Sequence, residues 1–259
     1  MSKTLLILSG DPAAAETAGR ITALGHILVI CDADPLAPAF AFADSCLIAD
    51  VRAPADCAAA AERYSRKIRR IDGVLCLTDA PLTAAAVTER LGLPGLSQHV
   101  AELADDRLRL KRAFASAGVT TCWHAEIFTP QELQRAAIAR ENLVVKPVER
   151  RGQEQRLTGA DDLATLFQAV KAVSPCGRVM IEQYPLPARI AAFLENGEVK
   201  GPAEWRDLIS RAASALDLRD GPLTAEIVEN GPELVDASPH LSSDSEFLEA
   251  AIRLATGEH

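Results

Sequence analysis

One lysine of this 259-residue chain, Lys146, is placed where it could bind a phosphate group. It follows the apolar run Leu143–Val145 and precedes Pro147. The apolar run predicts a buried strand, and the proline, which lacks an N–H group, marks the end of that strand. A positive charge fixed at a strand end suits an anionic ligand, although many surface strands also end in Lys-Pro. Whether Lys146 binds a phosphate must therefore be judged from the residues before and after it.

Acidic residues nearer the C-terminus could hold a magnesium ion. Glu226 and Asp236 lie in two short segments, 223–228 and 233–236, that we expect to pair as strands. Mg²⁺ takes oxygen ligands and keeps several of its waters, so one or two carboxylates with phosphate oxygens suffice. The stretch Asp236–His240 is equally consistent with a simple strand-end turn, which its Ser-Pro favours.

Composition excludes several classes of protein. Apolar residues make up 48% of the chain and charged residues 24%, as in an ordinary folded domain. The formal net charge of −9 argues against a nucleic-acid partner and against an anionic membrane surface. The six cysteines form neither a Cys-x-x-Cys motif nor a Cys/His cluster, so no zinc site or disulfide framework is indicated. Because no leader or membrane-spanning run is present, we expect a cytoplasmic protein.

The first 95 residues alternate between strand-like and helical segments, which predicts a Rossmann-like parallel sheet with helices on its faces. The expected strands and helices are, in order, 4–8, 13–24, 26–31, 46–48, 54–70 and 73–77. No G-x-G-x-x-G follows the first strand, so the dinucleotide-binding fingerprint is absent. Ligands of such sheets bind beyond the carboxyl ends of the strands, where Thr78 and Asp79 are the best candidates. Most other polar residues at this edge are better explained as turn formers and helix caps.

The rest of the chain predicts an α+β arrangement in two parts. Residues 96–186 contain a helix that begins near Asp106-Arg107, and strands are expected around Lys146 and at 179–182. Residues 187–259 contain a helix that ends near Leu216, the strand pair described above, and a final helix from Asp244. The domain boundaries expected from the sequence are therefore 1–95, 96–186 and 187–259.

The order of these features resembles the ATP-grasp superfamily, whose members use ATP to activate a carboxylate as an acyl phosphate and join it to an amine or similar nucleophile. The resemblance covers nearly the whole chain and implies an N-terminal pre-ATP-grasp domain followed by a shortened ATP-grasp region. It implies ATP and Mg²⁺ as cofactors and a small-molecule substrate. The site residues that it implies are Arg107 and Lys146 for the phosphates, Glu182, Gln183 and Tyr184 for adenine, Glu226 and Asp236 for the metal, and Ser238 and His240 for catalysis.

Several positions depart from the family pattern. Only Gly152 remains of the glycine-rich flap, where the charged run 149–156 is more typical of an exposed turn. Pro185 stands where a backbone N–H would meet adenine, and Arg189 stands where an acid often binds the ribose. Ser238 and His240 replace an amide and an arginine, and only residues 199–202 stand where relatives insert several dozen.

Two functions remain open on this evidence. One is an ATP-dependent carboxylate–amine ligase. The other is a degenerate ATP-grasp protein that binds a metabolite or a partner chain. A homo-oligomer or a pathway partner is compatible with either function.

Overall fold

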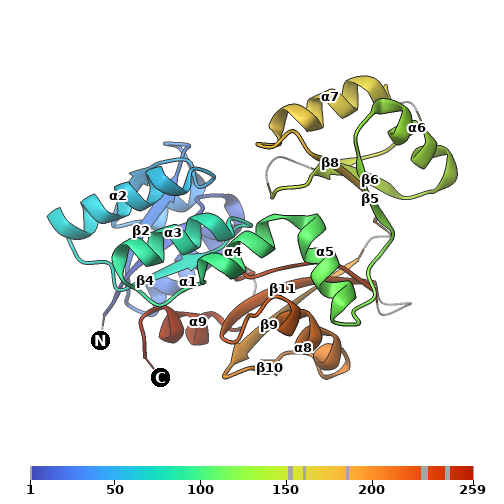
Figure 1. Ribbon diagram of the computed structural model, residues 1–259. Coiled ribbons are helices and arrows are strands. Elements are labelled where there is room, and N and C mark those ends of the chain that lie inside the picture. The colour runs from blue at the N-terminus through green and yellow to red at the C-terminus, as the bar shows by residue number, and fades with distance from the viewer. Residues whose placement is uncertain are drawn as a thin grey trace.

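The computed structural model describes residues 2–150, 154–159, 162–184, 187–228, 233–242 and 246–258. Within these ranges the chain forms three four-stranded sheets flanked by helices (Figure 1). The N-terminal sheet is parallel and the other two are antiparallel. The mixed α/β class and the parallel N-terminal sheet expected from the sequence are confirmed. No helix in the described ranges is both long and apolar enough to span a membrane.

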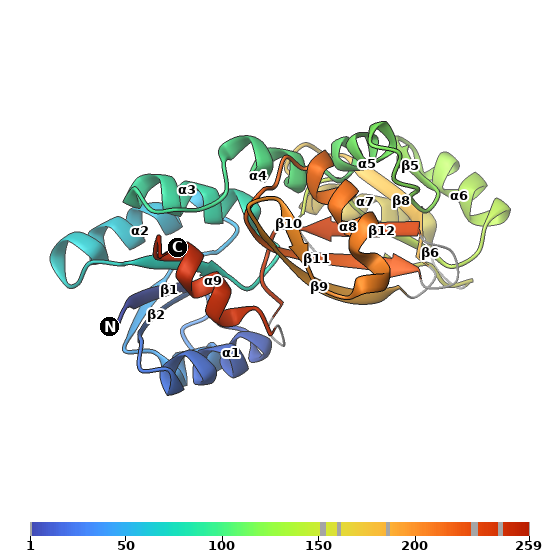
Figure 2. The same cartoon turned by 90° about the horizontal axis from the view of Figure 1, so that it is seen from below.

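The N-terminal sheet has the strand order β3-β2-β1-β4. Its elements are β1 (Thr4–Leu8), α1 (Pro12–Ala23), β2 (Ile27–Asp32), η1 (Pro38–Phe42), β3 (Ser45–Ile48), α2 (Pro54–Lys67), β4 (Gly73–Cys76) and α3 (Pro81–Leu91). Alternate residues of β1 point to opposite faces: Leu5 and Ile7 pack towards α1, whereas Leu6 and Leu8 pack towards α2 and α3. The face towards α1 also receives the C-terminal helix α9 (Leu248–Ala255), which lies beside α1 in Figure 2. The end of the chain therefore packs on the sheet that begins it.

The second sheet, with the order β5-β8-β6-β7, forms a lobe of its own (Figure 1). Its elements are β5 (His124–Ile127), α6 (Pro130–Ala139), β6 (Leu143–Pro147), β7 (Gln155–Arg156), α7 (Leu163–Val173) and β8 (Val179–Gln183). Leu143, Val145 and Ile181 face α6 and α7 in one hydrophobic cluster. Because side chains alternate along a strand, Lys146 and Glu182 face the opposite side, away from these helices. The predicted strand that carries Lys146 is therefore confirmed.

The third sheet has the order β10-β9-β11-β12 and lies below that lobe. Its strands and covering helices are α4 (Gln98–Asp105), α5 (Arg107–Ser116), β9 (Ala188–Glu195), β10 (Glu198–Lys200), η2 (Ala203–Trp205), α8 (Arg206–Ala215), β11 (Gly221–Val228) and β12 (Glu233–Ser238). Phe114 of α5 and Ile209 of α8 pack against Ala225 and Ile227 of β11. The intervening Glu226 therefore points to the other face, where it pairs in register with Asp236 of β12. The predicted pairing of these two strands is confirmed.

Candidate functional site

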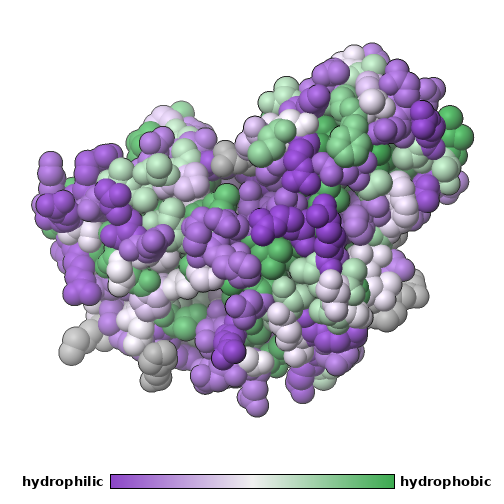
Figure 3. Space-filling model, viewed as in Figure 1, coloured by the Kyte–Doolittle hydropathy of each residue, from purple (hydrophilic) through white to green (hydrophobic). Residues whose placement is uncertain are grey.

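A polar cavity of about 360 Å³ lies where elements of all three sheets meet. Thr78 and Asp79, directly after β4, form one wall, so the cavity lies beyond the carboxyl end of a parallel strand. Hydrophilic residues also gather on the surface where the lobe of α6 and α7 joins the rest of the molecule (Figure 3). The polar residues that line the cavity are Asp11, Thr78, Asp79, Arg107, Arg150, Glu154, Tyr184, Arg189, Thr224, Glu226, Asp236, Ser238, His240 and Ser242.

The structure brings most of the expected site residues together. Thr78, Asp79, Arg107, Tyr184, Glu226, Asp236, Ser238 and His240 all line this cavity. Lys146 and Glu182 lie behind its wall, and Gln183 does not line it. Pro185, one of the departures from the family pattern, and Gly152, the one flap glycine that remains, fall outside the described residues. Asp11, by contrast, accepts a hydrogen bond from the N–H of Ala14 at 2.7 Å and caps α1, as the sequence suggested for polar residues at this edge.

Arg150 is one of the site residues that sequence reasoning missed. The charged run 149–156 favoured an exposed turn, and this prediction was wrong for its first two residues, because Glu149 and Arg150 are buried. Backbone hydrogen bonds with the start of α5 hold them in place: Arg107 N–H donates to the Val148 carbonyl at 3.0 Å, and Arg150 N–H donates to the Asp105 carbonyl at 3.1 Å. No periodicity of the sequence indicates these contacts, which join residues far apart in the chain.

The side chain of Arg150 joins Asp79, which was expected to contact the substrate, to Asp236, which was expected to hold the metal. Its Nη1 donates to Asp79 Oδ2 at 2.6 Å and to Asp236 Oδ2 at 2.9 Å, and its Nη2 donates to Asp236 Oδ1 at 2.7 Å. Burial alone would raise the pKa of Asp236, but the charges of Arg150, Lys146 and Arg107 bring it well below its ordinary value. The pKa of Asp79 is lowered in the same way, against burial, chiefly by Arg150. Both carboxylates are therefore ionised at neutral pH.

A second group of buried charges lies under the cavity wall. Glu182 is fully buried between two lysines: Lys111 Nζ lies 2.8 Å from its Oε2, and Lys146 Nζ pairs with its Oε1. Lys111 also donates to the Val235 carbonyl at 2.6 Å. Burial raises the pKa of Glu182, but Lys146 and Lys111 outweigh it, so the net shift is downward. Lys111 was not expected, although its position four residues after Arg107 places both on one face of α5.

Glu154 and Tyr184 separate Lys146 from the cavity. The Glu154 carboxylate lies 2.8 Å from Lys146 Nζ, and the ammonium group lies 5.9 Å from the centre of the Tyr184 ring. The side chain of Glu154 is 35% exposed and that of Lys146 only 1%. Glu154 therefore places a carboxylate on the lysine at the point where the phosphate was expected.

Glu226 is the acid of the cavity with the weakest partners. It accepts a hydrogen bond from the Tyr184 hydroxyl at 3.0 Å, and exposed Arg189 reaches it at 3.2 Å. Burial and the nearby charge of Asp236 raise its pKa above the ordinary value. Glu226 and Asp236 therefore differ sharply in charge environment although they face each other across two strands.

Ser238 and His240 play distinct parts at the end of β12. Ser238 Oγ donates to Asp79 Oδ1 at 2.5 Å. His240 Nδ1 is buried and has no hydrogen-bond partner among the described residues. Burial is the main cause that lowers the His240 pKa, and Arg150 adds to it, so the imidazole is neutral at pH 7. His240 does not supply the positive charge expected of an arginine at this position.

The residues present do not fit a magnesium ion held by Glu226 and Asp236. Both oxygens of Asp236 are bonded to Arg150, and Oδ1 also accepts the N–H of Ala237 at 2.8 Å. Among the described residues no three His, Cys, Asp or Glu side chains converge as metal ligands. A hard cation would also have to lie beside the guanidinium groups of Arg150 and Arg107.

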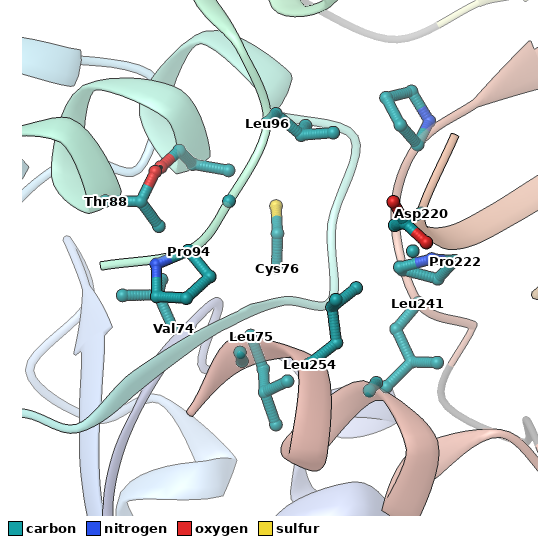
Figure 4. A pocket seen from close by; sticks show the side chains of 16 residues that line it. Val74, Leu75, Cys76, Thr88, Pro94, Leu96, Asp220, Pro222, Leu241 and Leu254 are labelled. Carbon is teal, nitrogen blue, oxygen red and sulfur yellow. The ribbon is translucent and has the colours of Figure 1, made fainter. Parts of the chain in front are cut away.

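A separate apolar cavity of about 310 Å³ lies between β4, α3, α9 and the start of β11 (Figure 4). Leu75 and Cys76 on one segment and Leu241 on another line it, and Leu241 N–H donates to the Cys76 carbonyl at 3.1 Å. Their neighbours Leu77 and Ser242 line the polar cavity, so these two segments form a partition between the cavities. Burial raises the pKa of the Cys76 thiol to about 11, so it is no ready nucleophile.

Comparisons with known proteins identify the fold. No family model matches the chain, and no curated protein matches its sequence. Among solved structures, L-amino acid ligase from Bacillus licheniformis is similar with a TM-score of 0.71 and 20% identity, covering 100% of this chain and 76% of that one. Carboxyaminoimidazole ribonucleotide synthase from Aspergillus clavatus, solved with ATP, gives 0.74 and 14% over 99% and 77%. N5-carboxyaminoimidazole synthetase from Staphylococcus aureus, solved with ADP, gives 0.72 and 14% over 100% and 79%.

The chain therefore has the ATP-grasp fold that the order of its motifs indicated. At these levels of identity the likeness establishes the fold alone.

Proposed function

We propose that this protein binds a nucleotide, with ATP as the expected ligand, in the cleft between its two antiparallel sheets, next to a small-molecule carboxylate. The observation that carries the proposal is the buried group Lys111–Glu182–Lys146, which has two cations for one fully buried carboxylate and a second, partly exposed carboxylate, Glu154, on its outer side. An excess of positive charge behind a cavity wall attracts an anion, and the low local dielectric strengthens that attraction. The structural neighbours solved with ATP and ADP support the same ligand class.

Each wall of the cleft has a role in this proposal. Lys146 binds the phosphates once Glu154 moves aside, and Arg107 lies across the cavity as a second cation. Tyr184, directly after β8, lines the cavity and is the residue that would face the base, whereas Glu182 and Gln183 do not line it. Thr78 and the end of β4 remain for the small molecule. Such positioned cations stabilise charge on a transferring phosphoryl group in ligases.

Two functions use a site of this kind, and the Arg150 contacts favour one of them. An ATP-dependent ligase would join a small-molecule carboxylate to an amine through an acyl phosphate, and would hold a metal at Glu226 and Asp236. In this protein both oxygens of Asp236 are bonded to Arg150. Because the metal position is filled by a side chain, we propose a binding role, with ligation as the activity of the ancestral fold.

Isothermal calorimetry with ATP tests the nucleotide site. Lys146→Met should weaken ATP binding by about tenfold to a hundredfold, as expected for one hydrogen bond to a charged group. Its fold should persist, because Glu182 keeps its pair with Lys111. Lys67→Ala, which removes an exposed lysine at the end of α2, is the matched control and should bind like the wild type. An absence of ATP binding to the wild type would overturn the proposal.

Phosphate release separates the two candidate functions. A binding protein releases no phosphate from ATP above background with any small carboxylate and amine supplied together. Release that depends on both substrates and is lost in Lys146→Met would establish the ligase instead.

A further inference from the structure

We infer that Arg150 occupies the divalent-cation position of the cleft as a cation built into the chain, so that this site takes no divalent metal ion. The inference concerns the same site as the proposed function but does not depend on a nucleotide being bound. Three observations support the inference: the hydrogen-bond donors of Arg150 are all used, the carboxylates that accept from them are those a metal would need, and the Arg150 side chain is held in place at several points.

Arg150 uses all of its hydrogen-bond donors on oxygen atoms. A guanidinium group has five N–H donors. Besides its bonds to Asp79 and Asp236, Nε donates to the Ala104 carbonyl at 2.5 Å and Nη2 to the Ala237 carbonyl at 2.8 Å. Two carboxylates and two backbone carbonyls thus surround the positive charge, as oxygen ligands surround a hard cation. No donor is left for a phosphate, so Arg150 does not itself bind the ligand.

The acids that a metal would need are engaged by this cation. Asp236 accepts two bonds from Arg150, and Arg107 Nε lies 3.6 Å from its Oδ2. Asp79 accepts one bond from Arg150 and one from Ser238. A divalent ion would have to displace the Arg150 guanidinium from its two carboxylates. The positive charges of Arg150 and Arg107 would also repel the ion. Of the two acids expected to hold the metal, only Glu226 is left, and without phosphate oxygens a single carboxylate does not hold a metal firmly.

The position of Arg150 is fixed by the fold. Its side chain is 2% exposed, and its contacts reach the end of α4, the loop after β4, and β12. Its backbone is held by the hydrogen bond to Asp105. A side chain anchored at so many points does not swing out to admit a metal. The anion of the cleft is left to Lys146 and to Arg107, whose buried Nε lacks a hydrogen-bond partner among the described residues.

Mn²⁺ binding, measured from the loss of the free-ion signal in electron paramagnetic resonance, tests this inference without any nucleotide. The wild type should show no Mn²⁺ binding that depends on Asp236, so its titration should match that of Asp236→Asn. Arg150→Ala frees the carboxylates of Asp79 and Asp236. This variant should bind Mn²⁺ at least about tenfold more tightly than the wild type, because changes in the groups around metal ligands alter metal affinity by about that factor or more. Arg109→Ala, which removes an exposed arginine of α5, is the control and should behave as the wild type.

Two results would overturn the inference. One is saturable Mn²⁺ binding by the wild type that is lost in Asp236→Asn. The other is a folded Arg150→Ala that binds no more Mn²⁺ than the wild type. If Arg150→Ala does not fold without metal, the wild-type and Asp236→Asn titrations still decide the question. Absence of ATP binding, by contrast, would count against the proposed function and leave this result standing.

Discussion

The cleft contains two groups of buried charges with opposite composition. At the end of β8, Lys111 and Lys146 flank one carboxylate, Glu182. At the end of β12, Asp79 and Asp236 flank one guanidinium, Arg150. We call the first the lysine group and the second the Arg150 group.

The difference lies in what each group has left for a ligand. The lysine group has two cations for one fully buried carboxylate, and a partly exposed carboxylate, Glu154, covers Lys146. The Arg150 group has no surplus positive charge, and its guanidinium has no unused donor. We therefore propose that the first binds a phosphate and that the second replaces a metal ion.

Removal of Arg150 should have the largest effect. Arg150→Met leaves the partly buried Asp79 and Asp236 beside each other without their main cation, so we expect a loss of about 5 kcal/mol in the free energy of unfolding. Urea denaturation measures it, with Arg109→Met as an exposed control expected within about 0.5 kcal/mol of the wild type. Adding Asp236→Asn to Arg150→Met should recover part of the loss. A loss below about 1 kcal/mol would show that Arg150 is not the central cation of its group.

Removal of Glu182 should have a smaller but still large effect. Glu182→Gln leaves two buried lysines without their shared carboxylate, and we expect about 3 kcal/mol of lost stability. The effect is smaller than for Arg150 because Lys146 keeps Glu154 and Lys111 keeps the Val235 carbonyl. The same urea series gives the comparison. If Glu182→Gln proved more damaging than Arg150→Met, the ranking of the two groups would be reversed.

Acid should weaken both groups together. The pKa values of Asp79, Asp236 and Glu182 are lower in the folded protein than in an unfolded chain. The folded state then binds fewer protons, so this stability is present above about pH 4, where unfolded Asp and Glu titrate, and is lost as the pH falls through the folded values. Thermal unfolding midpoints should drop steeply over that acid range, and less steeply in Asp236→Asn. Equal slopes in the two proteins would exclude Asp236 as a contributor.

Removing the Glu154 carboxylate, which covers Lys146, should have the smallest effect. Glu154→Gln removes the carboxylate that competes with a phosphate, and because this pair is partly exposed we expect ATP binding to tighten by about threefold to fivefold. Stability should change little. Calorimetry measures the affinity, and Glu132→Gln on α6 is a control in the same lobe but outside the cavity wall. Weaker ATP binding in Glu154→Gln would mean that Glu154 helps to hold the ligand.

The sequence predicted one of these groups better than the other. Lys146 and Glu182 directly follow short apolar runs, so the strands that carry them could be expected from local pattern. Thr78 and Asp79 followed from the rule that ligands bind at the carboxyl ends of parallel strands. Arg150 could not be found in this way, because its burial depends on Asp79 and Asp236, which are 71 and 86 residues away in the chain.

The same limit applies to the fold. The strand and helix order of the first 95 residues follows from periodicity, and the parallel sheet follows from that order. The return of α9 to the N-terminal sheet does not, because its apolar face, which includes Leu248 and Ile252, would suit any of the three sheets. Local pattern specifies which face of an element is buried, and only the tertiary fold specifies what buries it.

The most direct test of the account is a calorimetric titration of the wild type with ATP, once with excess EDTA and once with Mg²⁺. We predict saturable binding in EDTA that Mg²⁺ improves by less than about threefold, because the cations that receive the phosphates belong to the chain and the metal position is already filled. Binding that appears only with Mg²⁺ would contradict the account.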